Sequence, residues 1–397
     1  MANIEKRGDS YRITVSCGYD VEGKKIRAHM TWKPDKGMTE RQIKKELERQ
    51  AVLFEERCGK GGVASGAIKF QTFAEEWFDK YAEKQLKEST VTRYRNLSKR
   101  VYIAIGAKRL DKITAKDIQL FVENLGEKGI NETRENSGMS SKTIRCYVSF
   151  ISTILDYAMK LDMIDHNPCR RVILPPLVQK EREIFTLEEA QQFLSLLQEE
   201  EWQYRMFFTL AVYSGMRKGE LLGLEWKDID FDSCTIHICR NSQYTNRKGT
   251  YTDTPKTSRS DRVLKMPRSI MDLLQEYQAW QEEERTRIGD QWQEHDRVFT
   301  QWNGVPMSPH SPLKWLIRFC EKNDLKKVNI HSLRHLNATL LINSGADIRT
   351  TSAALGHSNT STTLNIYAHT FEEAQAKASE AVADILKFNK KDEKKRA

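Results

Sequence analysis

The segment HSLRH, residues 331–335, contains the residues best suited to bind a phosphate. His331 and Arg334 are three residues apart, so both side chains lie on one face of a predicted helix. Leu333 and Leu336 lie on an apolar stripe that anchors this helix to a core. An isolated His-Arg pair is most often a solvated helix face, so the pair needs support from other residues.

Four more residues give that support. Arg217 lies in SGMRKGELLGLEW at a predicted turn before a helix, and Lys256 lies in a polar segment that leads into a strand-like run. After HSLRH, Gly345 is predicted to end the helix, and a second helix should begin at Asp347 and end at Gly356. His357 and Tyr367 follow. The complete set is Arg217, Lys256, His331, Arg334, His357 and Tyr367.

The six residues in this order resemble the signature of the tyrosine recombinase (phage-integrase) family. The resemblance implies that Arg217 and Arg334 clamp the scissile phosphate, with hydrogen bonds from His331 and His357. Arginine suits this role because its planar fork binds phosphate oxygens bidentately. It also implies that no metal, ATP or other cofactor is needed.

The resemblance implies that Tyr367 attacks phosphorus and forms a 3′-phosphotyrosine. His331 is the family's usual group for removing the phenolic proton, and Lys256 would protonate the departing 5′-oxygen. Lys248 and Lys265 flank the same predicted hairpin and are alternatives to Lys256. Glu220 either orients the constellation or forms an ordinary helix ion pair.

Possible metal ligands are few. Cys234, His237 and Cys239 lie in SCTIHICR, an alternating run that favours strand packing over metal binding. His331 and His335 have the spacing of a metalloprotease helix, but Ser332 occupies the position of its catalytic Glu. We therefore expect no bound metal.

Length and composition indicate a multidomain globular protein. The chain has 397 residues, of which 39% are hydrophobic and 30% charged, with a net charge of +9. The excess of basic residues favours a polyanionic partner. We see neither a long apolar run nor a signal peptide, so we expect a soluble, cytoplasmic protein.

Residues 1–60 are predicted to form two strands and a helix that Thr39 caps. This module resembles the arm-type DNA-binding module of prophage and conjugative-element integrases. Basic residues that could line a DNA groove in it are Arg12, Lys24, Lys25 and Arg27. A Gly-rich linker, residues 59–69, follows it.

Residues 69–165 are predicted to form a bundle of four amphipathic helices, with Thr72 and Glu75 as the capping box of the first. By resemblance this is the core-binding domain, and Arg93 and Arg95 are candidate DNA contacts. After a Pro-rich linker, residues 180–397 should form a mixed α+β catalytic domain, opened by a capping box at Thr186. The fold class is thus mainly α with small β-sheets.

The resemblance points to an integrase of a prophage or conjugative transposon. Its expected partners are the core and arm sites of double-stranded DNA, a homo-tetramer on that DNA, and an excision factor or host DNA-bending protein. The alternatives are a chromosome-dimer resolvase, a type IB topoisomerase, or a catalytically inactive DNA-binding accessory protein. The tail, residues 370–397, has an apolar helical stripe that could fold back on its own domain or dock on a neighbouring protomer.

Overall fold

The computed structural model divides into two compact units, Met1–Gln179 and Lys180–Ala397. It describes residues 2–19, 25–35, 37–59, 68–131, 136–177, 183–253, 261–356, 359–361, 363–364, 367, 376, 379–380, 382–383 and 386. Lys24, Lys256, His357 and the apolar stripe of the tail therefore lie outside the described residues.

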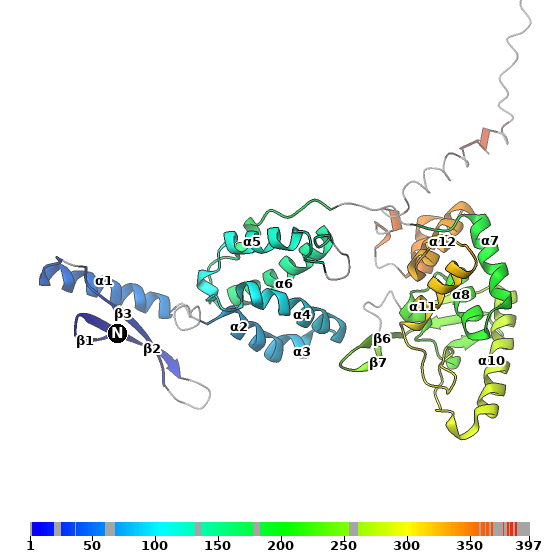
Figure 1. Cartoon of the computed structure of the whole chain (residues 1–397), viewed down its shortest axis with the longest axis horizontal. Coiled ribbons are helices and arrows are strands. Elements are labelled where there is room, and N and C mark those ends of the chain that lie inside the picture. The colour runs from blue at the N-terminus through cyan, green and yellow to red at the C-terminus, as the bar shows by residue number, and fades with distance from the viewer. Residues whose placement is uncertain are drawn as a thin grey trace, which may run out of the picture. The chain divides into compact units, whose positions relative to one another are not determined.

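The N-terminal module is an antiparallel three-stranded sheet packed against one helix (Figure 1). Its elements, in sheet order and then chain order, are β1 (Asn3–Arg7), β2 (Ser10–Tyr19), β3 (Lys25–Trp32) and α1 (Glu40–Gly59). The two predicted strands are present as β2 and β3. The strand β1 was not predicted, because it is exposed at every position and has no apolar alternation. The expected helix cap is present, since the backbone N–H of Gln42 donates a hydrogen bond to Thr39 Oγ1.

The module has its own hydrophobic core. Ile13, Val15 and Ala28 point from the sheet toward Leu47 and Phe54, and all five side chains are buried. Because strand residues alternate in direction, the neighbouring positions of β2 and β3 lie on the opposite face of the sheet.

The following helices form the predicted bundle around a second core that includes Trp77, Ile118, Phe150 and Ile151. The elements are α2 (Phe70–Trp77), η1 (Phe78–Ala82), α3 (Glu83–Gln85), α4 (Glu88–Val101), η2 (Tyr102–Gly106), η3 (Leu110–Lys112), α5 (Ala115–Gly126), α6 (Ser141–Lys160) and η4 (Pro168–Arg171). The predicted capping box at Thr72 is wrong, because α2 begins at Phe70 and has Lys69 as its N-cap.

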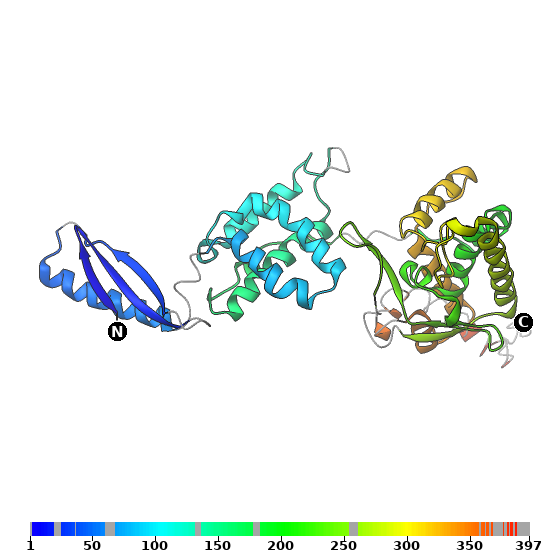
Figure 2. The same ribbon diagram turned by 90° about the horizontal axis from the view of Figure 1, so that it is seen from below.

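The second unit surrounds a large core with helices and two small sheets (Figure 2). The sheets have the strand orders β4-β5-β8 and β6-β7. The strands are β4 (Ile229–Asp230), β5 (Thr235–Ile238), β6 (Asn241–Thr245), β7 (Gly249–Asp253) and β8 (Arg262–Lys265).

The α-helices in the described part of this unit are α7 (Leu187–Leu196), α8 (Trp202–Ser214), α9 (Lys218–Leu221), α10 (Arg268–Ile288), α11 (Ser311–Lys322), α12 (Ile330–Asn343) and α13 (Ile348–Leu355). The predicted capping box at Thr186 and Glu189 opens α7. The mainly helical fold with small sheets is as predicted. None of the helices in the described part of the chain is long and apolar enough to cross a membrane.

Candidate active site

Helix α12 carries the HSLRH motif, and most of its residues are buried. It begins at Asn329, whose side chain accepts a hydrogen bond from the Ser332 amide. His331 lies exposed at its start, whereas Arg334 is only 2% exposed. A guanidinium so deeply buried needs fixed hydrogen-bond acceptors. Arg334 Nη1 donates to the Gly215 carbonyl at 2.8 Å, and Nη2 donates to the Leu355 carbonyl at 2.5 Å.

Arg217 occupies the predicted turn, as the N-cap of α9. Its Nη1 lies 2.6 Å from Glu220 Oε1, and its backbone amide donates to Glu220 Oε2 at 3.0 Å. Nη2 reaches across the fold to the Gly356 carbonyl at 3.1 Å. The Arg217 side chain is 38% exposed, so it is more accessible from outside than Arg334.

Arg262, at the start of β8, is a third arginine in this cluster, and the sequence did not point to it. Its Nη2 lies 2.9 Å from Glu220 Oε2, and the two side chains are 8% and 7% exposed. Its Nε donates to the Ala354 carbonyl at 2.9 Å. The signal in the sequence is weak: alternation with Leu264 places an arginine where a strand expects an apolar residue.

The last turn of α13 gathers all three arginines. The carbonyls of Ala354, Leu355 and Gly356 accept from Arg262, Arg334 and Arg217 respectively. Helix C-terminal carbonyls lack partners within the helix and carry partial negative charge, so they suit cationic donors. As predicted, Asp347 caps the start of α13 and Gly356 ends it in the left-handed conformation with φ 63°.

The pKa values of Arg334 and Glu220 reflect both their burial and the charges close to them. Burial, together with the charges of Arg217 and Arg262, lowers the pKa of Arg334 to about 9, although Glu220 opposes the shift. Burial alone would raise the pKa of Glu220, but hydrogen bonds and charge from Arg262 and Arg217 outweigh it and hold this pKa below its ordinary value. Arg217 and Arg262 thus share the Glu220 carboxylate, and Arg334 bonds to backbone carbonyls, so these four side chains together carry excess positive charge.

Tyr367 lies next to this cluster and is 4% exposed. Its ring packs in a small apolar group with Ala338, Ile342 and Leu355. Its phenolic oxygen lies 2.5 Å from Nδ1 of His335, which is also 4% exposed. A negative charge on the Tyr367 oxygen would raise the pKa of Arg334, so Tyr367 and Arg334 interact electrostatically. The structure thus brings Arg217, Arg334 and Tyr367 together.

The other predicted site residues are placed differently. Lys256 and His357 lie outside the described residues, although the Gly356 carbonyl at the entry to His357 is held by Arg217. Of the two alternative lysines, Lys248 lies over the Tyr251 ring at 5.8 Å, and Lys265 pairs with Thr235 between β5 and β8.

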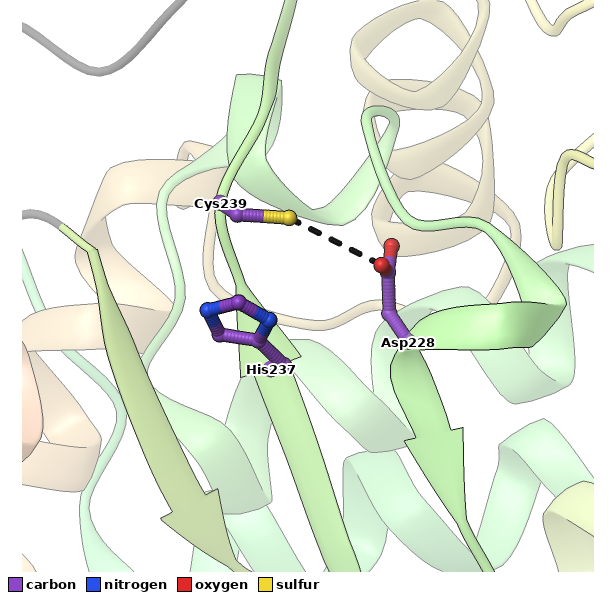
Figure 3. A group of neighbouring side chains, drawn as sticks. All are labelled: Asp228, His237 and Cys239. Atoms are coloured by element: carbon purple, nitrogen blue, oxygen red, sulfur yellow. Dashed lines mark hydrogen bonds between the residues drawn. The ribbon is translucent and has the colours of Figure 1, made fainter.

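One possible cation site lies beside the small sheet. Asp228, His237 and Cys239 offer ligand atoms within 4.8 Å of one another (Figure 3). However, Cys239 Sγ donates to Asp228 Oδ1 at 3.6 Å, and the Arg240 guanidinium pairs with the same oxygen. A cation here would have to displace Arg240, so the geometry favours a protein hydrogen-bond network. Cys234, which the sequence placed with His237, bonds to the Phe231 carbonyl instead.

The candidate DNA contacts of the N-terminal module lie on the sheet. Arg12 pairs with Thr31 and Arg27 pairs with Ser16, so both arginines lie on the face opposite the buried Ile13 and Val15. Lys25 is exposed and pairs with Tyr19, beyond an irregularity in the β2-β3 register.

The two bundle candidates have different surroundings. Arg93 is exposed beside the Tyr94 ring. Arg95 forms ion pairs with Glu75, Asp79 and Glu83 and lies 3.9 Å from the Phe78 ring centroid. These contacts favour a structural role for Arg95.

The half-exposed Arg217 and the buried Arg334 are thus held at one end of α13, beside Tyr367 in the same unit. The comparisons define the class of protein as a tyrosine recombinase, an enzyme that breaks and rejoins DNA strands. The sequence comparisons give the family. Residues 183–374 match the phage integrase family, and residues 69–126 match its N-terminal SAM-like domain. The chain belongs to the phage integrase family.

Among its relatives, the ICEBs1 integrase of Bacillus subtilis (strain 168) is 28% identical over 95% of this chain and 97% of its own length. The transposase from transposon Tn916 of Enterococcus faecalis is 23% identical over 74% of this chain and 70% of its own length.

Among solved structures, the Tn1549 transposon integrase in complex with a circular intermediate DNA has a TM-score of 0.65 and 21% identity. It covers 79% of this chain and 99% of its own. A lambda integrase dimer bound to a core site has a TM-score of 0.55 and 15% identity, with 91% and 93% coverage. These likenesses agree on the fold.

Proposed function

We propose that this chain is the integrase of a conjugative transposon or prophage, which cuts and rejoins DNA at specific sites to integrate and excise the element. The proposal rests on one observation: the end of α13 holds Arg217, Arg262 and Arg334 together, next to Tyr367. A phosphodiester would balance the excess positive charge of this cluster.

The clamp acts on the transition state. Negative charge builds up on the non-bridging oxygens as Tyr367 attacks, and preorganised guanidinium groups stabilise it without reorganising. Arg217 and Arg334 perform this role, because their backbone acceptors fix both side chains before DNA arrives. The arginines thereby supply charge that many nucleases obtain from metal ions.

Tyr367 forms the bond to phosphorus, and the 3′-phosphotyrosine conserves the energy of the broken phosphodiester for resealing. Lys256 protonates the departing 5′-oxygen, and His331 and His357 donate hydrogen bonds to the phosphate. The lysine and His357 roles rest on the motif order alone.

DNA must reach groups that are covered in the DNA-free conformation. Arg217 is 38% exposed, whereas Arg334 and Tyr367 are 2% and 4% exposed. Docking on the duplex therefore displaces what covers Arg334 and Tyr367, while the carbonyl contacts keep the guanidinium groups in place, and this ties cleavage to correct DNA binding.

The N-terminal module recognises separate arm sites through the Arg12 and Arg27 face of its sheet, and Arg93 belongs to the core-site contacts. The active assembly is a homo-tetramer, in keeping with a lambda integrase tetramer bound to a Holliday junction, which shares this fold. An excision factor or host DNA-bending protein would set direction. The protein would work in the cytoplasm, on the nucleoid.

The test is covalent capture on a nicked suicide substrate, followed by denaturing electrophoresis. Wild type should form a heat-stable adduct, and Tyr367→Phe should bind the DNA but form none. Tyr204→Phe is the matched control, because it removes a hydroxyl in the same unit and keeps the ring stacked 4.9 Å from Trp315. An adduct in Tyr367→Phe at the normal cleavage position would refute the nucleophile.

A further inference from the structure

We propose that His335, the second histidine of HSLRH, takes the phenolic proton of Tyr367 during cleavage and returns it during rejoining. The proposal rests on the proposed function, because it needs Tyr367 to be the nucleophile. It departs from the family expectation, which gives this step to His331.

Contact geometry separates the two histidines. His335 Nδ1 lies 2.5 Å from the phenolic oxygen, inside a site where both side chains are almost fully buried. His331 is exposed at the start of α12, and its ring centroid lies 4.7 Å from that of His335. His335 therefore touches the reacting atom, and His331 lies between His335 and the surface.

Helix spacing explains this placement. His331, Arg334 and His335 are three and four residues apart, so all three lie on one face of α12. Ala338 and Ile342 continue this face and pack against the Tyr367 ring. The Tyr367 ring is thus held on the same face of α12 as Arg334, and its phenolic oxygen points at the imidazole of His335.

The proton balance is simple. A phenol with a pKa near 10 is a poor nucleophile at neutral pH, so its proton must leave as the O–P bond forms. With the imidazole protonated at Nε2, Nδ1 accepts the phenolic hydrogen bond and then the proton, while the 5′-oxygen leaves with a proton from Lys256. Rejoining reverses both transfers, since the 5′-hydroxyl returns its proton and His335 reprotonates the phenolate.

Charge around His335 favours the transfer only in the DNA complex. Arg334 directly precedes His335 on α12, and the charges of Arg217, Arg262 and Glu220 all act on Arg334. In the complex, the scissile phosphate adds negative charge to this cluster, which makes an imidazolium at His335 less costly. The base thus becomes effective when the substrate is in place.

The test uses His335→Asn, because the Asn side-chain oxygen can occupy the Nδ1 position and accept the hydrogen bond but cannot hold the proton. Cleavage of the nicked substrate should fall about 100-fold or more, the usual contribution of a general base, with DNA affinity unchanged. The deficit should persist on a substrate with a 5′-bridging sulfur, which leaves without protonation. Lys256→Ala should recover on that substrate.

A second substrate checks the integrity of the site. Joining a 5′-hydroxyl strand to a 3′-p-nitrophenyl phosphate needs the arginine clamp but not Tyr367. His335→Asn should join at the wild-type rate, whereas Arg334→Ala and His331→Asn should not. If His335→Asn fails to join, His335→Gln takes its place in both assays.

Three results would overturn the proposal: cleavage by His335→Asn at the wild-type rate, rescue by the bridging sulfur, or loss of p-nitrophenyl joining in both the Asn and Gln variants. Wild-type protein that forms no adduct would instead overturn the proposed function.

Discussion

Replacing Arg262 with Met should destabilise the second unit and leave the first unchanged. The substitution keeps an unbranched side chain but removes the charge and the bonds to Glu220 and to the Ala354 carbonyl. Removing one partner of a buried ion pair costs about 3 to 5 kcal/mol. Because Glu220 keeps Arg217 at 2.6 Å, we expect the lower value of about 3 kcal/mol.

The expected melting shift follows from the size of the unit. Lys180–Ala397 falls in the class of about 150 to 250 residues, in which each kcal/mol lowers Tm by about 2 to 4 °C. Arg262→Met should therefore lower the Tm of this unit by about 6 to 12 °C. Scanning calorimetry of the full chain measures it, with the transition of Met1–Gln179 as an internal reference.

Two further variants test the cause. Arg285→Met removes an exposed arginine that pairs with Glu282 and Glu294, and it should leave Tm nearly unchanged. Combining Arg262→Met with Glu220→Gln should cost less than the sum of the two single changes, because both remove the same ion pair. A shift under about 2 °C for Arg262→Met, or full additivity, would refute the assigned role of this pair.

Three other predictions concern charge and domain roles. The pKa of Glu220 is lower in the folded than in the unfolded protein. Its contribution to stability is therefore present above a pH of about 4.3 and is lost as the pH falls through the folded pKa. The free energy of unfolding of Glu220→Gln, measured by denaturation at several pH values, should fall less steeply toward acid pH than that of the wild type. Arg334→Ala should reduce cleavage far more than DNA affinity, and equal losses in suicide-substrate and gel-shift assays would make it a simple affinity residue. Deleting Met1–Lys60 should preserve cleavage of a core site and abolish footprints on arm sites, so identical footprints would contradict the arm-binding role.

Local signals in the sequence were sufficient for the scaffold of the site. Capping residues and glycines fix the ends of helices within a few residues, so Asp347 and Gly356 defined α13 correctly, and the turn at Arg217 was found in the same way. The strand β1 was missed because an exposed edge strand needs no apolar alternation.

Contacts between residues far apart in the chain could not be predicted from the sequence. Arg262 meets Glu220 and Ala354, which are 42 and 92 residues away, and only the fold brings them together. His335 was visible only as a histidine four residues after His331, and nothing local indicates that Tyr367, 32 residues later, points at it. The spacing of residues along a helix shows which of them share a face, but it does not show which distant residue packs against that face.

The choice of acceptors explains how the site stays cationic although its arginines are held so firmly. Ion pairing with three carboxylates would fix three guanidinium groups equally well, but it would cancel their charge. The carbonyls of Ala354, Leu355 and Gly356 orient the same groups through partial charges, and Glu220 is the carboxylate that pairs with Arg217 and Arg262. Burial, followed by the charges of Arg217 and Arg262, lowers the pKa of Arg334 to about 9, which is the cost of this arrangement. In the proposed function, a phosphate oxygen would offset the part of this cost that is due to charge, so the binding energy of the anion would be concentrated at the point where transition-state charge develops.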